Sequence, residues 1–181
     1  MKTIKVVVLG DKSVGKSWLV TTFVTGRNPG GYIPTLFDNY GRRVEYKNKL
    51  YTVSIWDTTG NSDFTKMRTI SLQQADVFIL CYAINNVISF NNIKKWLEPL
   101  KEFEKPIVLC ATKADLKDED YIDIDVTEDI VRKNELFGYV ETSAIEFTNV
   151  NRVFNVAIEA VINPKKLIKG RYSCFGLFTC C

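Results

Sequence analysis

The sequence predicts an α/β fold: a six-stranded, mostly parallel sheet with one antiparallel edge strand and helices on both faces. Two observations predict it. Short apolar runs alternate with helical stretches along the 181 residues, as in parallel strands connected by helices. The runs 38–47 and 50–56 are instead joined through Lys47-Asn48-Lys49, which is typical of a hairpin and therefore of an antiparallel pair.

Each expected strand is one short apolar run, and each expected helix lies between two such runs. The strands are expected near 3–9, 38–47, 50–56, 76–83, 106–111 and 138–141. The helices are expected near 16–25, 64–74, 87–104, 127–136 and 147–162, and the acidic segment 117–125 as a solvated loop. Open sheets of this kind bind ligands at the carboxyl ends of their strands. Motifs that directly follow strands should therefore meet at one edge.

Composition limits the class of protein. A chain of 181 residues, 46% hydrophobic and 25% charged, suits one soluble domain with a sizeable core. No apolar run approaches the length of a membrane span, and residues 1–9 are too short for a signal peptide, so a cytoplasmic protein is expected. The absence of histidine excludes an imidazole base or a histidine-bound metal. Cys81 and Cys110 lie in apolar runs and are expected to be inert core residues.

The first motif, Gly10–Ser17, reads GDKSVGKS and follows an apolar run. It is the P-loop pattern in its usual context of strand, loop and helix start, so it predicts the P-loop NTPase fold. Gly10 and Gly15 allow the backbone to curl with its N–H groups toward phosphate oxygens. Lys16 is expected to reach the β- and γ-phosphates, and the Ser17 hydroxyl to ligate Mg²⁺. The competing interpretation is an ordinary glycine-rich turn.

The second motif is Asp57-Thr58-Thr59-Gly60, at the end of another apolar run. Asp57 could hold the Mg²⁺ of the P-loop, and the N–H of Gly60 could approach a γ-phosphate closely. A simple turn is the alternative, because Asp and Gly are common in turns.

The third and fourth motifs predict the base. Thr112-Lys113-Ala114-Asp115 follows the run 107–110. Asp115 can accept hydrogen bonds from the N1–H and 2-amino groups of guanine, a donor pair that adenine lacks, and the stem of Lys113 can lie along the base. In Thr142-Ser143-Ala144, small residues let backbone N–H groups reach the base carbonyl.

These four motifs, with Thr35 between the first two, resemble the guanine-nucleotide motifs of the Ras superfamily of small GTPases from Lys5 to about Val161. The segment 32–40 and Thr112 are similar to the Rho and Rac subfamily, as is the stretch 67–82. The resemblance implies GTP or GDP with Mg²⁺, the latter held by Ser17, Thr35 and Asp57. It implies catalytic roles for Lys16, Thr35, Gly60 and Asn61, although Thr35 could also be a simple cap. Further nucleotide contacts are implied at Lys12, Ser13, Val14, Gly15, Trp18, Tyr32, Leu116, Ser143 and Ala144.

The resemblance also implies partners. Effector proteins would bind through 32–40 and 60–74, and an exchange factor, an activating protein and a dissociation inhibitor would regulate the switch. Signalling to the actin cytoskeleton or to membrane traffic follows from the Rho and Rac likeness. No nucleic acid partner is expected.

Four departures from the family shape the expected mechanism. Lys12 replaces a glycine, where it would obstruct an arginine finger, supply a cation itself, or simply be solvated. Asn61 replaces the glutamine that orients the attacking water, so slow hydrolysis is expected. Asn28 replaces an aromatic residue over guanine, which should speed nucleotide release unless Arg27 stacks there. The stretch 116–127 looks too short for the extra helix of Rho proteins.

Two other readings compete with a hydrolysing switch. A hydrolysis-deficient, constitutively GTP-bound module of the Rnd type is favoured by Asn61 and Lys12. A P-loop ATPase or kinase is disfavoured by Asp115.

Residues 1–163 are expected to form the GTPase domain and residues 164–181 a flexible basic tail. No acidic residue follows Glu159, and the tail ends with three cysteines after four basic residues: Lys165, Lys166, Lys169, Arg171, Cys174, Cys180 and Cys181. The terminal Cys-Cys resembles the lipidated ends of Rab proteins. Lipids together with basic residues would anchor the protein to the cytoplasmic face of an anionic membrane; an unmodified tail is the alternative.

Overall fold

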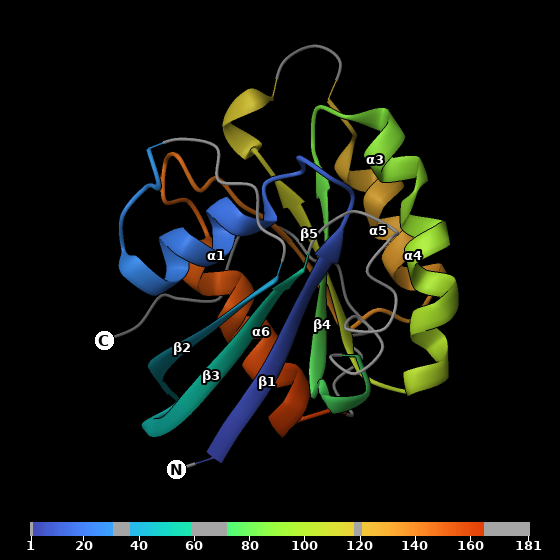
Figure 1. The fold of residues 1–181 in the computed structure, drawn as a ribbon. Coiled ribbons are helices and arrows are strands. Elements are labelled where there is room, and N and C mark those ends of the chain that lie inside the picture. Colours follow the sequence, from blue (N-terminus) through green and yellow to red (C-terminus); the bar gives the residue numbers. More distant parts are fainter. Residues whose placement is uncertain (1, 31–36, 59–71, 118–120, 165–181) are drawn as a thin grey trace.

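A computed structural model of the chain describes residues 2–30, 37–58, 72–117 and 121–164 (Figure 1). Its six strands are β1 (Lys2–Gly10), β2 (Phe37–Tyr46), β3 (Lys49–Thr58), β4 (Val77–Ala83), β5 (Ile107–Thr112) and β6 (Gly138–Glu141). They form one sheet in the order β2-β3-β1-β4-β5-β6. The edge strand β2 pairs antiparallel with β3, and the other neighbours are parallel. The predicted sheet is confirmed.

Helices cover both faces of this sheet, as predicted. One face carries α1 (Lys16–Thr25) and α6 (Val150–Ile162); the other carries α3 (Val87–Asn91), α4 (Ile93–Leu100) and α5 (Ile124–Lys133) (Figure 1). Two short 3₁₀ helices, η1 (Lys101–Phe103) and η2 (Ala114–Leu116), follow α4 and β5. Most of the helix expected at 64–74 lies outside the described residues; 72–74 are helical.

The alternation of side chains along the central strands divides the core into two. In β1, Val6 and Val8 pack with the α1 and α6 side, where the rings of Phe23 and Phe154 stack at 3.8 Å. Val7 packs on the opposite face, with α4 residues such as Leu97. Both faces of β1 are therefore covered, which explains why its sequence is a continuous apolar run rather than an alternating one.

The expectation of one helix over 87–104 is wrong. The segment is divided into α3, α4 and η1, with Asn92 between the first two. Pro99 lies inside α4 and has no N–H to donate, and α4 ends one residue later at Leu100. Glu104 then adopts a left-handed conformation with φ of 50° and ends η1.

Two helix starts also differ from expectation. Helix α5 begins at Ile124 rather than 127, because Asp123 caps it by accepting a hydrogen bond from the Asp125 N–H at 3.0 Å. The preceding loop is not simply solvated, since Ile122 is buried and donates its N–H to the Ile84 carbonyl at 3.0 Å. Helix α6 begins at Val150 rather than 147, after a left-handed Asn149 with φ of 56°.

The two described cysteines are buried on neighbouring strands. A hydrogen bond with Cys110 and burial both raise the pKa of the Cys81 thiol. A raised pKa disfavours the reactive thiolate. The prediction that these residues are inert core side chains is consistent with this environment.

Among the described residues, none of the helices is long and apolar enough to cross a membrane.

Candidate nucleotide-binding site

The loop between β1 and α1 has a backbone that only certain residues can adopt. Gly10 has φ of 136°, and a Cβ there would lie 2.1 Å from the backbone oxygen of Cys81 on β4. Ser13 and Gly15 also have positive φ, at 64° and 98°. The loop therefore curls tightly against the carboxyl end of β4, which is the shape a phosphate-binding loop requires.

Helix α1 begins at the end of this loop, so the free N–H groups of its first turn lie beside the loop. Its cap is Gly15, which has no side chain to accept from the first amides, and its first turn holds no acidic residue. The first N–H groups of a helix carry a partial positive charge and favour an anion. The start of α1 is thus suited to a phosphate group.

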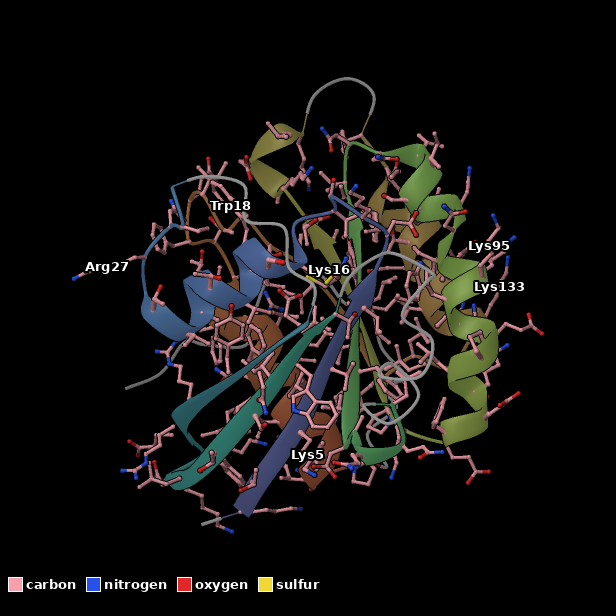
Figure 2. The ribbon with its side chains drawn as sticks, in the orientation of Figure 1. Lys5, Lys16, Trp18, Arg27, Lys95 and Lys133 are labelled. Carbon is pink, nitrogen blue, oxygen red and sulfur yellow. The ribbon has the colours of Figure 1, made fainter. Side chains whose placement is uncertain are left out.

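Lys16 lies inside the curl of the loop. Only 6% of the residue is exposed, and its Nζ donates to the carbonyl oxygens of Gly10 and Asp11 at 2.9 and 2.7 Å. Burial lowers the pKa of Lys16, while the nearby Cys81, Asp57 and Asp11 oppose that shift. Figure 2 shows the side chain at the carboxyl ends of the strands, close to the start of α1. A cation held here can meet a phosphate without leaving the loop.

Asp57 and Ser17 supply oxygen ligands of the kind that Mg²⁺ prefers. Asp57 is fully buried near the end of β3, in register with Val8 of β1, and its charge acts on Lys16. The neighbouring Thr58 hydroxyl donates to the Val8 carbonyl at 2.8 Å, which holds this strand end to β1. The described part of the chain contains no group of three or more His, Cys, Asp or Glu residues that could hold a metal. Mg²⁺ usually keeps waters and substrate phosphates as ligands, so one or two protein oxygens can suffice to hold it.

Thr112 and Lys113 connect the predicted base-binding segment to the P-loop. The buried Thr112 hydroxyl lies within hydrogen-bonding distance of the carbonyls of Val14 and, at 3.0 Å, Tyr82. Lys113 is left-handed with φ of 59°. Its Cε would be 3.9 Å from a Cβ on Gly15, so the end of its stem lies beside the P-loop.

Asp115 and Ser143 bring the third and fourth motifs together. The Ser143 hydroxyl donates to Asp115 Oδ1 at 2.6 Å and accepts from the Glu146 N–H at 3.0 Å. The backbones are also joined, because the Ala114 N–H donates to the Thr142 carbonyl at 3.0 Å. Asp115 is half-buried. One carboxylate oxygen is therefore oriented by Ser143, an arrangement that can present the carboxylate edge to two donors of a base.

Asn28 has a contact that sequence reasoning missed. Its Nδ2 donates to the Ile145 carbonyl at 3.0 Å, and its Oδ1 lies 3.5 Å from the Thr22 hydroxyl. The segment after α1 is thereby attached to the loop after Ser143, 117 residues away. Arg27 is exposed and points away from the fold (Figure 2).

The other predicted site residues differ in whether the structure describes them and in how exposed they are. Tyr32, Thr35, Gly60 and Asn61 lie outside the described residues. Val14 is buried, Trp18 and Ala144 are half-buried, and Lys12, Ser13 and Leu116 are exposed. The residues that the structure brings to one edge of the sheet are Gly10, Gly15, Lys16, Ser17, Asp57, Thr112, Lys113, Asp115 and Ser143.

Two comparisons with known proteins agree with this geometry. Residues 5–163 match the Ras family. The chain is also 34% identical over 173 residues to the Ras-like GTP-binding protein RHO1 of Entamoeba histolytica, an alignment that covers 93% of this chain and 80% of that protein. The match extends across all four motifs and most of the sheet. The chain belongs to the Ras family of small GTPases and is Rho-like within it.

Proposed function

We propose that this protein is a GTP-binding switch that hydrolyses GTP slowly and recruits effector proteins in its GTP form. The observation that carries the proposal is the Ser143–Asp115 hydrogen bond of 2.6 Å. It joins the two guanine-recognition segments on the same sheet edge as the buried Lys16 of the P-loop.

Different residues of the site would bind the phosphates, the Mg²⁺ ion and the guanine base. The curled loop and the start of α1 bind the phosphates with their N–H groups, and Lys16 neutralises charge that develops on the β- and γ-phosphates. Ser17, Asp57 and Thr35 would hold Mg²⁺, which screens phosphate charge when bound. Asp115 selects guanine, and Lys113 supports the base. Thr35 and Gly60 would grip the γ-phosphate and release it after hydrolysis, so the segments 32–40 and 60–74 change with the nucleotide.

Slow hydrolysis follows from two side chains. Asn61 is one methylene shorter than the glutamine that it replaces, and a displacement of about 1 Å can cost on the order of 10²-fold in rate. Lys12 is exposed at the loop, where it would obstruct an arginine finger from an activating protein. The second candidate function, a GTP-bound module without hydrolysis, rests on these same two residues.

Membrane attachment through residues 164–181 completes the proposal. Lipid on the cysteines of the tail, together with its four basic residues, would place the switch on the cytoplasmic face of a membrane. An exchange factor and a dissociation inhibitor would control its loading and its position, and the Rho likeness favours signalling to actin or traffic.

Nucleotide selectivity tests the proposal. Purified protein with Mg²⁺ is titrated with fluorescent GDP, GTP, ADP and ATP, alongside Asp115→Ala. We expect guanine nucleotides to bind at least about 10³-fold more tightly than adenine nucleotides, since a site built for hydrogen bonds rejects analogues that lack them. Asp115→Ala should lose that preference while it keeps weak phosphate binding. Equal affinity of the wild type for adenine and guanine nucleotides would refute a guanine switch.

A further inference from the structure

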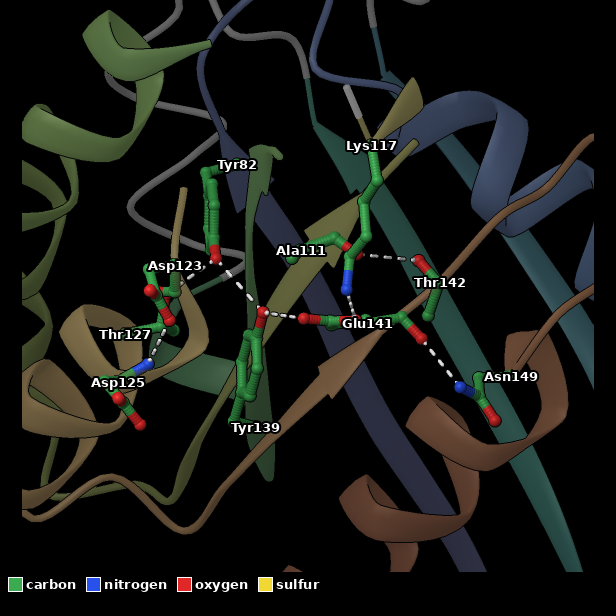
Figure 3. Close-up of polar contacts among 10 residues, drawn as sticks. All are labelled: Tyr82, Ala111, Lys117, Asp123, Asp125, Thr127, Tyr139, Glu141, Thr142 and Asn149. Atoms are coloured by element: carbon green, nitrogen blue, oxygen red, sulfur yellow. Dashed lines mark hydrogen bonds and ion pairs between the residues drawn. The ribbon is translucent and has the colours of Figure 1, made fainter. Parts of the chain in front are cut away.

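A chain of hydroxyl groups runs through the core on the α5 side of the sheet and ends at the guanine-recognition segments (Figure 3). The Tyr82 hydroxyl lies 3.0 Å from the Thr127 hydroxyl and 3.2 Å from that of Tyr139. Tyr139 donates to Glu141 Oε1 at 3.0 Å. The other carboxylate oxygen, Oε2, accepts from Lys117 Nζ at 2.6 Å.

The proton positions in this chain follow from counting hydrogens. Each phenol has one hydrogen, and Tyr139 gives its own to the carboxylate of Glu141. Tyr82 must therefore donate to Tyr139. The single hydrogen of Thr127 is shared between two acceptors, the Tyr82 oxygen at 3.0 Å and the Asp123 carbonyl at 3.2 Å. The donations from Tyr82 and Tyr139 both run toward Glu141, so these two bonds polarise one another in the same direction. Burial raises the pKa of Tyr82 to about 12 and also raises that of Tyr139. Both phenols therefore keep their protons at neutral pH.

Glu141 occupies a junction between the two segments that recognise the base. It directly precedes Thr142-Ser143-Ala144, while its partner Lys117 directly follows Leu116 at the end of η2. Its backbone carbonyl accepts from Asn149 Nδ2 at 2.9 Å, which attaches the residue before α6 to the same point. Figure 3 shows Lys117 and Tyr139 converging on Glu141 from different elements.

We propose that Glu141 is a positioning residue for guanine recognition. Its carboxylate holds Lys117, and with it η2, at a fixed place relative to Ser143, so that Asp115 and Ser143 keep their 2.6 Å contact when a base enters. The two phenols, Tyr82 and Tyr139, orient the carboxylate through Oε1, the oxygen that does not bind Lys117. The inference rests on the proposed function and adds a residue that does not itself touch the nucleotide.

The Glu141–Lys117 ion pair is partly buried, which increases its contribution to the position of η2. The Glu141 side chain is 12% exposed and that of Lys117 37% exposed. Because the carboxylate is mostly buried, loss of one partner leaves it with a desolvation cost that a surface ion pair would not have. The same arrangement would contribute little if both groups were in open solvent.

The chain contains a matched control at the opposite end of the sheet. Glu159 of α6 accepts from the Tyr46 hydroxyl at 3.0 Å and from Lys47 Nζ at 2.7 Å. This cluster also consists of one tyrosine, one glutamate and one lysine, and the Glu159 side chain is 13% exposed. It lies at the β2–β3 hairpin, away from the base-recognition segments.

The experiment compares Glu141→Gln and Lys117→Met with Glu159→Gln and Lys47→Met in the full chain with Mg²⁺. The readouts are the GDP dissociation rate, the affinity ratio of GDP to IDP, and the thermal midpoint at saturating GDP. IDP lacks the 2-amino group of guanine, so the ratio reports the Asp115 contact. We expect about tenfold faster GDP release and an at least threefold lower GDP-to-IDP ratio for both site variants, on the scale of one charged hydrogen bond. The GDP dissociation rate and the GDP-to-IDP affinity ratio should both remain at the wild-type value in the two hairpin variants.

An unchanged GDP-to-IDP ratio in Lys117→Met and Glu141→Gln would overturn the inference, whatever happens to the thermal midpoint. An equal fall in the hairpin variants would overturn it too, because the effect would then be general. Should Glu141→Gln fail to fold, Lys117→Met decides, since its side chain is more exposed. Wild-type protein without a preference for GDP over ADP would instead refute the proposed function itself.

Discussion

Trp96 on α4 donates its indole N–H to the carboxylate of Asp11 in the P-loop, with 2.7 Å between Nε1 and Oδ1. Asn92, between α3 and α4, donates to the other oxygen at 2.7 Å. The start of the P-loop is thus held against the helix layer by two hydrogen bonds to one charged group. No motif predicted this connection, because the residues are 81 and 85 positions apart.

Replacement of Asp11 by alanine should loosen the P-loop. Two hydrogen bonds to a carboxylate are lost and two donors remain without their partner, so we expect a loss of about 2 kcal/mol in the free energy of unfolding. The GDP dissociation rate should rise with it. Urea unfolding at saturating GDP measures the first effect. Lys95→Ala, an exposed neighbour of Trp96 on α4, is the control, and an equal loss there would contradict the assignment.

Replacement of Gly10 by alanine should be more damaging. The added Cβ would lie 2.1 Å from the Cys81 backbone oxygen, and φ of 136° is unfavourable for alanine. We expect a loss of at least about 3 kcal/mol, from overpacking and backbone strain together. Gly41→Ala is the comparison, since nothing lies within 4 Å of a Cβ there. Similar unfolding curves for the two variants would show that β4 can move aside.

Restoring the residues typical of the family should raise the hydrolysis rate. In single-turnover measurements with GTP and Mg²⁺, we expect Asn61→Gln to be faster than wild type by on the order of 10²-fold, because the longer side chain reaches the attacking water. Lys12→Gly should add to the rate only when an activating protein supplies an arginine. An ordinary rate in the wild type that Asn61→Gln does not increase would contradict the prediction.

Asn28 provides a test of base packing. Asn28→Phe should slow GDP release by about fivefold, because an aromatic ring over the base contributes on the order of 1 kcal/mol. Asn28→Ala separates the two effects, since it removes the 3.0 Å hydrogen bond to the Ile145 carbonyl without adding a ring. We expect release from Asn28→Ala to be faster than from wild type. Dissociation of a fluorescent GDP measures all three, and equal rates would refute a role for this position.

The Glu159 cluster predicts a pH dependence of stability. Burial alone would raise the pKa of Glu159, but hydrogen bonds from Lys47, Asn163 and Tyr46 lower it overall below the ordinary 4.5. A lowered folded-state pKa contributes stability above the ordinary value, and this stability is lost as the pH falls through the folded-state value. The stability difference between wild type and Glu159→Gln should therefore be full at neutral pH, begin to fall near pH 4.5 and disappear only below the lowered folded-state pKa. Urea unfolding across this range measures it; a difference that grows in acid would contradict the sign.

The sequence predicts the sheet and its edge well because these depend on local patterns. A fully covered strand such as β1 needs a continuous apolar run, and a P-loop needs glycine where φ is positive. Helix limits were less predictable. Asn92 and Pro99 interrupt 87–104, and the capping Asp123 starts α5 early, because such positions depend on individual side-chain bonds.

The meeting of the four motifs at one edge could be predicted, but individual contacts between other distant segments could not. The Asn28–Ile145, Trp96–Asp11 and Glu141–Lys117 hydrogen bonds join parts of the chain that only the folded sheet brings together. Polar residues such as Tyr139 and Glu141 look like ordinary strand-end residues in the sequence. Their partners become visible only when β6 lies beside β5.

Helix α6 separates the two ends of the molecule. Its first residue, Val150, follows the loop that holds Ser143, and its last turns lie at the β2–β3 hairpin through the Lys47–Glu159 ion pair of 2.7 Å. Thirteen helical residues span about 20 Å. Asn163 and Pro164, which follow the helix, therefore lie at the end of the sheet opposite to Ser143 and the P-loop. The helix acts as a rigid spacer of that length between the loop that holds Ser143 and the β2–β3 hairpin.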